Sequence, residues 1–191
     1  MKRIVLAITG ASGMIYAKRL FDQLQPRAET HVILSEHGAE VLQLELGLTA
    51  AYFEKENAEV HRNSRMNDSL ASGSFKTDGM VVCPGTMGTI GRIASGVSSS
   101  LIERAADVVL KEKGKLILVP RETPLSTIHL KNLLELDQAG ALILPANPGF
   151  YDNPQSVEDV ADFIVARILD HLGMEHRIQE PYEPKRRQKS I

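Results

Sequence analysis

Residues 116–124 read Leu-Ile-Leu-Val-Pro-Arg-Glu-Thr-Pro, a short apolar run that stops at a proline and is followed by an arginine and a glutamate. An apolar run of this length between turn residues is typical of a strand buried on both faces of a parallel sheet. In parallel α/β sheets, ligands bind beyond the carboxyl ends of the strands. Arg121 and Glu122 therefore stand where a cation for an anionic ligand and a proton-transfer group would be placed. Two solvated charges on a surface loop explain the pair equally well.

Strands and helices alternate on both sides of this stretch. Further strands are predicted at residues 4–8, 31–34, 80–83 and 141–144. Helices are predicted at 12–24, 37–46, 98–113, 125–136 and 156–172, the last with Ser156 as its N-cap. Residues 47–77 are polar and weakly periodic, which predicts a long loop. Short apolar strands that alternate with helices predict an α/β fold with a Rossmann-like doubly wound parallel sheet, a three-layer sandwich of the flavodoxin-like kind.

Length and composition favour a single soluble domain. The chain has 191 residues, 43% of them hydrophobic, and a formal net charge of -2 at pH 7. We expect one domain at 1–180 and a basic tail at 181–191. The near-neutral charge argues against nucleic-acid or membrane-surface binding, and no run reaches the roughly 20 apolar residues of a membrane span. The one cysteine, Cys83, allows no internal disulfide, so we expect a cytoplasmic protein in which Cys83 is an inert core thiol.

Turns rich in small and hydroxyl residues follow two of the predicted strands. Residues 9–13 read Thr-Gly-Ala-Ser-Gly, and residues 83–89 read Cys-Pro-Gly-Thr-Met-Gly-Thr. Small residues let the backbone approach a ligand, and the start of the next helix offers free N–H groups to a phosphate. Ordinary turns with Ser12, Thr86 and Thr89 as helix caps are the alternative. The first turn matches neither G-x-G-x-x-G nor a P-loop, so a phosphate or flavin is favoured over a nicotinamide dinucleotide.

Basic side chains supply further candidates. Arg104 and Lys111 are seven residues apart on one helical face and could bracket a phosphate, whereas a solvated face with an Asp107–Lys111 pair is the usual explanation. Arg167 lies at the edge of an apolar stripe that is predicted to begin at Val157, where it either meets an anion or extends into solvent.

The remaining signals are weaker. Residues 145–151, Pro-Ala-Asn-Pro-Gly-Phe-Tyr, predict a rigid loop in which Tyr151 either offers its hydroxyl to a phosphate or packs within the loop. The six histidines show no metal-binding spacing, so no metal site is predicted. The G-x-S-x-G elbow of a serine hydrolase is absent.

Taken together, five segments resemble the UbiX-type flavin prenyltransferases, in the same order over nearly the whole chain. They are residues 9–13, Leu-Ile-Glu-Arg-Ala-Ala-Asp-Val at 101–108, Leu-Val-Pro-Arg-Glu-Thr-Pro at 118–124, Pro-Gly-Phe-Tyr at 148–151 and Val-Ala-Arg-Ile-Leu at 165–169. The resemblance implies an enzyme that joins the dimethylallyl group of dimethylallyl phosphate to reduced FMN at N5 and C6. The prenylated FMN would serve a UbiD-type decarboxylase, as in ubiquinone biosynthesis. It further implies a homo-oligomer, a dodecamer with sites at subunit contacts.

The same resemblance implies roles for individual residues. Contacts to FMN would come from Gly10, Ala11, Ser12, Ser35, Thr86, Met87, Gly88, Thr89 and Arg121. Dimethylallyl phosphate would be held by Arg104, Lys111, Arg121, Tyr151 and Arg167. Ser12, Glu45 and Glu122 would be the catalytic side chains, with Glu122 carrying a proton.

Two departures and two rival functions accompany the resemblance. Many relatives read Cys-Pro-Cys-Ser-Met-Lys-Thr where this chain has residues 83–89, and several carry a tryptophan near the C-terminus, where this chain has Tyr182. An FMN-binding carrier and a cysteine-peptide decarboxylase-like flavoprotein are the alternatives. The preference between monophosphate and pyrophosphate, and the identity of the decarboxylase, stay open at this stage.

Overall fold

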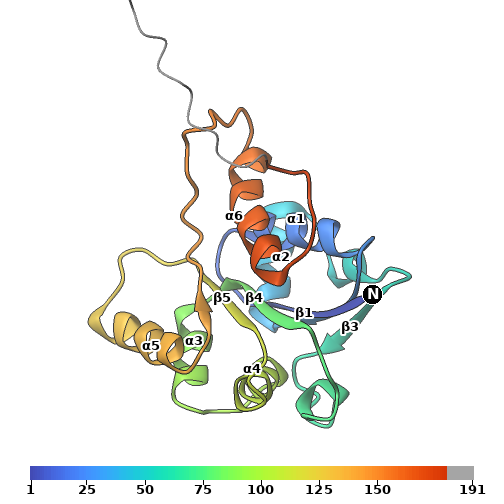
Figure 1. The fold of residues 1–191 in the computed structure, drawn as a ribbon, viewed down its shortest axis with the longest axis vertical. Coiled ribbons are helices and arrows are strands. Elements are labelled where there is room, and N and C mark those ends of the chain that lie inside the picture. Colours follow the sequence, from blue (N-terminus) through green and yellow to red (C-terminus); the bar gives the residue numbers. More distant parts are fainter. Residues whose placement is uncertain (180–191) are drawn as a thin grey trace, which may run out of the picture.

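Six parallel strands form one sheet in the computed structural model (Figure 1), which describes residues 1–179. The strands are β1 Lys2–Ile8, β2 Ala28–Leu34, β3 Ala58–Arg62, β4 Gly79–Gly85, β5 Leu116–Pro120 and β6 Leu142–Ile143. They lie in the order β3-β2-β1-β4-β5-β6, so the chain reverses its direction of winding between β1 and β4. This is the strand order of the Rossmann fold, and it confirms the predicted doubly wound parallel sheet.

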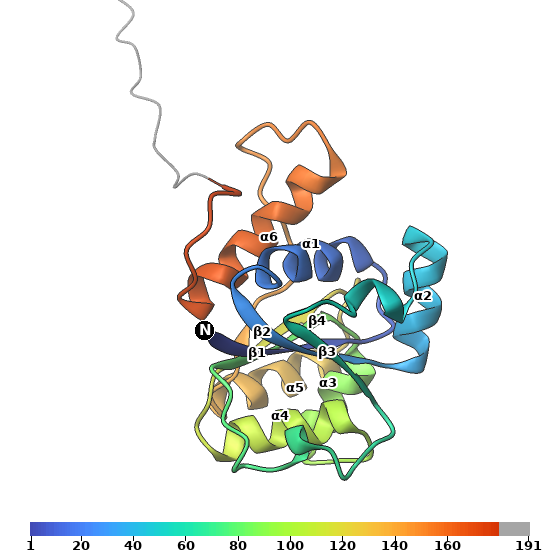
Figure 2. The same cartoon turned by 90° about the vertical axis from the view of Figure 1, so that its right-hand side faces the viewer.

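Helices cover both faces of the sheet (Figure 2). Two pack side by side on one face, α1 Met14–Leu24 and α6 Val157–Leu172, and are joined by a two-pronged ion pair of Arg19 with Asp162. On the other face lie α3 Met87–Ala94, α4 Leu101–Lys111 and α5 Thr127–Gln138. α2 Glu36–Leu46 follows β2, and its buried Leu42 belongs to the α1–α6 core. Each face therefore has its own apolar core, as in a three-layer sandwich.

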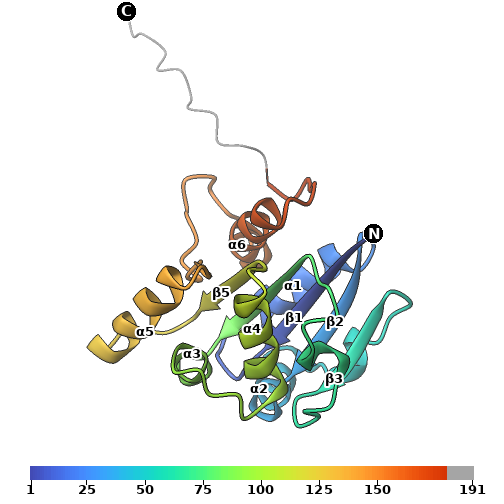
Figure 3. The same ribbon diagram turned by 60° about the horizontal axis from the view of Figure 1, so that its bottom comes forward.

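The largest correction concerns residues 47–77, which are not one long loop. They contain the edge strand β3 and two short helical turns, η1 Ala50–Phe53 and η2 Ser69–Ala71. Figure 3 shows β3 at the edge of the sheet beside β2, on the far side of β1 from β4 and β5. An edge strand pairs on one side only, and within β3 only His61 is buried, so the segment lacks the continuous apolar run of the central strands.

Helix boundaries differ from the prediction for local reasons. α1 begins at Met14 because Gly13 is its N-cap, with a left-handed φ of 106°, so Ser12 is not the cap. Residues 87–94, which follow the turn after β4, form the separate helix α3. At α6 the predicted N-cap Ser156 is confirmed, with Asp159 completing a capping box. Val157 is 67% exposed, so the apolar stripe of α6 begins at Ala161 and not at Val157.

Residues 180–191, with the basic tail and Tyr182, lie outside the described part of the chain. Among residues 1–179, no helix has the length and apolar character needed to cross a membrane.

Candidate active site

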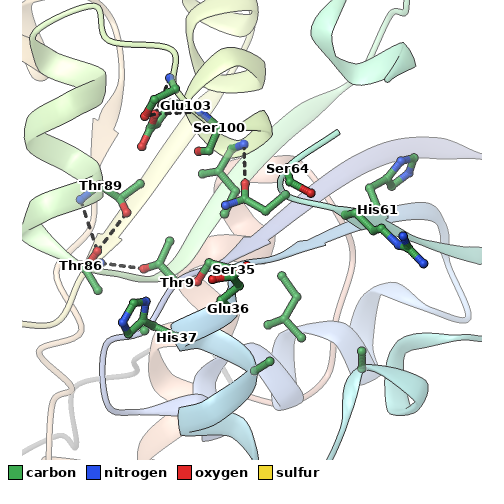
Figure 4. A pocket seen from close by; sticks show the side chains of 18 of the residues that line it. Thr9, Ser35, Glu36, His37, His61, Ser64, Thr86, Thr89, Ser100 and Glu103 are labelled. Carbon is green, nitrogen blue, oxygen red and sulfur yellow. Dashed lines mark hydrogen bonds between the residues drawn. The ribbon is translucent and has the colours of Figure 1, made fainter. Parts of the chain in front are cut away.

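A cleft of about 810 Å³ opens where β1, β2, β3 and β4 end (Figure 4). Its lining comes from the turn after β1, the first turns of α2 and α3, the segment after β3 and the entry to α4. The position between β1 and β4 is the point at which the strand order reverses, the usual ligand site of such sheets. The volume is within the range of small-molecule and cofactor sites.

Three helices begin at this cleft. Ser35 caps α2 by accepting a hydrogen bond from the Gly38 amide, and Thr86 caps α3 by accepting one from the Thr89 amide. The cleft is also lined by Ser100, the N-cap of α4. Helix N-termini carry a partial positive charge and unpaired N–H groups, so this arrangement favours a phosphate or another anion.

Close packing fixes the turn after β1 against α2. A Cβ on Gly10 would lie 2.6 Å from the Cβ of His37, so only glycine fits without a shift of the backbone or of α2. Thr9, which is 1% exposed, ties the same turn to β4. Its Oγ1 donates to the Pro84 carbonyl at 2.7 Å and accepts from the Thr86 amide at 2.8 Å. The two sides of the cleft are therefore fastened together at its floor.

A buried carboxylate holds a cation at the cleft wall. Glu103 is 1% exposed and accepts from Arg92 Nε at 2.5 Å and from the hydroxyl and amide of Ser99 at 2.6 and 2.8 Å. Burial alone would raise the pKa of Glu103, but the Ser99 and Arg92 contacts outweigh it and lower the pKa below its ordinary value. Arg92 also donates to Thr89 Oγ1, so its charge is fixed beside the start of α3.

A second anion-binding feature lies at the start of α1. The Glu45 carboxylate accepts from the Gly13 amide and, at 2.7 Å, from the Met14 amide. Burial opposes ionisation of Glu45, but bonds from Ser12 and these two amides, with the charge of Arg121, lower its pKa. The N-terminus of α1 thus already binds an oxyanion, and it does so next to a serine hydroxyl and an arginine.

Arg121 has unused hydrogen-bonding capacity. It directly follows β5, and its backbone amide donates to the Gly85 carbonyl. Its side chain passes Gly13, and its Nε is buried without a hydrogen-bond partner among the described residues. A buried guanidinium nitrogen of this kind needs an acceptor, and a phosphate oxygen would supply one.

The residues predicted to bind FMN divide into three groups. Gly10, Ser35, Thr86 and Thr89 line the cleft. Ser12 and Arg121 lie at the neighbouring start of α1. The other three do not line the cleft: Ala11 and the side chain of Met87 are buried, and Gly88 is exposed.

Within a single chain, the cations predicted to hold the prenyl phosphate do not meet at one site. Arg104 donates to the Ala71 carbonyl and pairs with Asp107, which replaces the predicted Asp107–Lys111 pair. Lys111 pairs with Glu112. Arg167 is half exposed and pairs with Asp170.

The remaining predicted side chains, Tyr151 and Glu122, do not line the cleft either. Tyr151 is 61% exposed, and its ring packs edge-on against Phe163 of α6 at 5.8 Å. Glu122 is exposed and accepts a bond from the Thr123 amide.

Several cleft residues were not predicted as site residues: Thr9, His37, Asn63, Arg92 and Glu103. Asn63 accepts from the Ile102 amide through its side chain and from the Leu101 amide through its carbonyl, which docks the segment after β3 on α4. Thr9 could have been predicted as a site residue from the sequence, since it is a polar residue that directly follows an apolar strand. Cys83, by contrast, is fully buried with a raised thiol pKa, in agreement with the predicted inert thiol.

Comparison with known proteins gives matches along nearly the whole chain. The flavoprotein family model matches residues 1–169. A flavin prenyltransferase UbiX of Pseudomonas aeruginosa is 46% identical over 188 residues, which span 91% of this chain and 90% of that protein. The crystal structure of AnUbiX (PadA1) in complex with FMN and dimethylallyl pyrophosphate is 40% identical, with a TM-score of 0.91 over 96% of this chain and 98% of that one. A dodecameric FMN-dependent Ubix-like decarboxylase from Escherichia coli O157:H7 is 39% identical, with a TM-score of 0.90 over 95% of this chain and 100% of that one.

Proposed function

The chain belongs to the flavoprotein family, and because flavin prenyltransferases match it over about nine-tenths of its length, we propose that it is a flavin prenyltransferase. It joins a dimethylallyl group from dimethylallyl phosphate to reduced FMN. The observation that carries this proposal is the match at TM-score 0.91 to a structure that holds both FMN and a dimethylallyl donor. The two adjoining anion-binding features of this chain fit two phosphorylated ligands.

The cleft fits the flavin. Its volume suits a cofactor, and the starts of α2 and α3 offer amide and hydroxyl donors for the FMN phosphate. Gly10 lines the cleft without a side chain, so a ligand can approach the backbone of the first turn closely. When bound, reduced FMN supplies the nucleophilic atoms.

Ser12, Glu45 and Arg121 fit the prenyl phosphate. A phosphate at the start of α1 would take the place now held by the Glu45 carboxylate and would give the buried Arg121 Nε its acceptor. Cations and amides directed at a departing phosphate stabilise the charge that develops when its bond to carbon breaks. Glu45, displaced from the amides, would then be available to hold or move a proton near the bound flavin.

The other predicted residues fit a site shared between subunits. Large apolar side chains are exposed on α5, with Ile128, Leu130 and Leu134 each more than half exposed, and Phe150 is 66% exposed on the loop before α6. Apolar surface of this kind marks a protein interface, and the matched Escherichia coli protein is dodecameric. We propose that this chain forms a dodecamer in which Arg104, Lys111, Tyr151, Arg167 and Glu122 reach the site of a neighbouring subunit. Enclosure by a neighbour would also exclude water from the transfer step.

The direct test mixes the protein with reduced FMN and dimethylallyl phosphate under anaerobic conditions and analyses the flavin by mass spectrometry. A five-carbon adduct is expected, and a parallel reaction with dimethylallyl pyrophosphate establishes which donor is preferred. Tightly bound but unmodified FMN would favour the carrier alternative. Loss of carbon dioxide from a peptide with a C-terminal cysteine would favour the decarboxylase alternative. Delivery of the product to a UbiD-type decarboxylase and a cytoplasmic location stay predictions.

A further inference from the structure

Two histidines and a glutamate from neighbouring strands meet on one face of the sheet, at its β3 edge. His31 of β2 lies opposite Glu59 of β3, and Ile33 lies opposite His61. Residues two apart on a strand share a face, so Glu59 and His61 are directed to the same side as His31. His31 and His61 are 4% and 5% exposed, whereas the Glu59 side chain is 68% exposed.

The three side chains have the spacing of ligands around one metal ion. His31 Nδ1 and His61 Nε2 are 2.9 Å apart, and each lies 3.8 Å from Glu59 Oε2. Three atoms with these separations surround a point that is about 2 Å from each of them. Zinc–nitrogen and zinc–oxygen bonds in proteins have this length.

The outer nitrogen of each histidine meets a carboxylate. His31 Nε2 lies 3.0 Å from Glu29 Oε1, and His61 Nδ1 lies 2.9 Å from Asp68 Oδ2. A carboxylate oxygen accepts the hydrogen of an imidazole N–H, so these contacts place the ring hydrogens on the two outer nitrogens.

The inner nitrogens are then left without hydrogens. A neutral imidazole has one N–H, so His31 Nδ1 and His61 Nε2 direct lone pairs at each other across 2.9 Å. Two facing lone pairs beside the Glu59 carboxylate are arranged to bind a cation.

We propose that His31, His61 and Glu59 bind one zinc-class divalent cation, with Glu29 and Asp68 fixing the orientation of the two imidazoles. Two nitrogens and one carboxylate oxygen form a typical three-residue zinc ligand set, which leaves a fourth position for water. Carboxylates on the outer nitrogens are the usual support of metal-bound histidines. Sequence spacing gave no metal motif because the ligands come from two strands, 28 and 30 residues apart.

The site would connect β2 to the edge strand β3 and thereby stiffen one wall of the cleft. His61 itself lines the cleft, together with its neighbours Val60 and Arg62, and is labelled beside Ser64 in Figure 4. The expected effect of the metal is therefore on stability and on the order of this wall, and no bond is made or broken at the ion.

The test measures zinc binding to the full-length protein after chelator treatment. Isothermal titration calorimetry should show one Zn²⁺ per chain, and Co²⁺ in its place should give visible d–d absorption bands. Glu59→Gln replaces a direct ligand and should weaken zinc binding by at least the roughly 10- to 100-fold that loss of an outer-shell partner costs. Because Glu59 is exposed, this variant should fold, and Glu56→Gln, also exposed and three residues away, should bind zinc as the wild type does.

Zinc at a concentration that just saturates the wild type should also raise its melting temperature, and should raise that of Glu59→Gln less. Uptake that is equal in the wild type and Glu59→Gln, or no uptake, would overturn the proposal. So would nitrogen NMR of the histidine rings that shows one proton shared by His31 Nδ1 and His61 Nε2 in the presence of excess zinc.

Discussion

Thr9→Val removes one buried oxygen at the floor of the cleft without changing the shape of the side chain. In the wild type this oxygen bonds to the Pro84 carbonyl and the Thr86 amide. The Pro84 carbonyl keeps a weaker bond from the Thr9 amide at 3.3 Å, whereas the Thr86 amide has only the threonine oxygen as its partner among the described contacts. Losing one net hydrogen bond and burying one unpaired donor costs about 2–4 kcal/mol.

Urea denaturation at fixed protein concentration, followed by circular dichroism, measures this change. The midpoint should fall while the slope stays constant, since the surface exposed on unfolding is unaltered. Thr9→Ser keeps the hydroxyl and should recover most of the loss. The matched control is Thr49→Val, because Thr49 is exposed and makes no capping bond, and it should stay within about 0.5 kcal/mol of the wild type.

Affinity for FMN provides a second measure of the same variant. The Thr86 amide belongs to the N-cap of α3, so loss of its anchor should loosen the start of that helix and weaken FMN binding. A Thr9→Val protein with wild-type stability and wild-type FMN affinity would refute the view that this threonine fastens the two sides of the cleft.

Three further substitutions test the electrostatics of the site. Arg121→Gln should weaken binding of dimethylallyl phosphate about 10- to 150-fold, because it removes one charge-assisted hydrogen bond. The control is Arg27→Gln, at an exposed arginine remote from the cleft, which should bind the phosphate as the wild type does. Equal affinities of Arg121→Gln and the wild type in calorimetry would contradict the role of Arg121. Glu45→Gln should slow prenylation while phosphate binds at least as tightly, since a competing charge leaves the α1 amides, and weaker phosphate binding would count against that placement. Glu103→Gln should lower the free energy of unfolding at pH 7. Because folding lowers the Glu103 pKa, the ionised carboxylate stabilises the fold at pH values above its ordinary pKa of 4.5. This stabilisation is lost as the pH falls through the lower pKa of the folded state, so the denaturation midpoints of variant and wild type should converge in acid. A difference between the two midpoints that persists in acid would refute the proposed role of the Glu103 carboxylate.

The central part of the fold could be predicted from the sequence because each buried strand is a continuous apolar run. Strands β1, β4 and β5 have this pattern, and their alternation with helices requires a parallel sheet. Strand β3 lacks it, because pairing on one side leaves alternate residues in solvent, so its sequence indicates a loop. Helix α3 is absent from the predicted helices, because its eight residues include Gly88 and Gly91, which have low helix propensity.

The candidate site was predictable where a polar or charged side chain closely follows a buried strand, as Thr86 and Arg121 do. The anchoring contacts were not predictable, because they join residues distant in sequence. Glu45 meets Gly13 across 32 positions, and Thr9 meets Thr86 across 77. Family resemblance supplied Glu45, but only the folded chain shows that its carboxylate occupies the start of α1.

The contact between Gly10 and His37 also limits which amino-acid substitutions this protein can accept during evolution. Any side chain at position 10 would push α2 outward and carry Ser35 with it, so a mutation there would survive only together with a second change near residue 37. Substitutions at position 10 and near residue 37 should therefore occur together. A library that varies positions 10 and 37 together should yield functional combinations that neither single-site library contains.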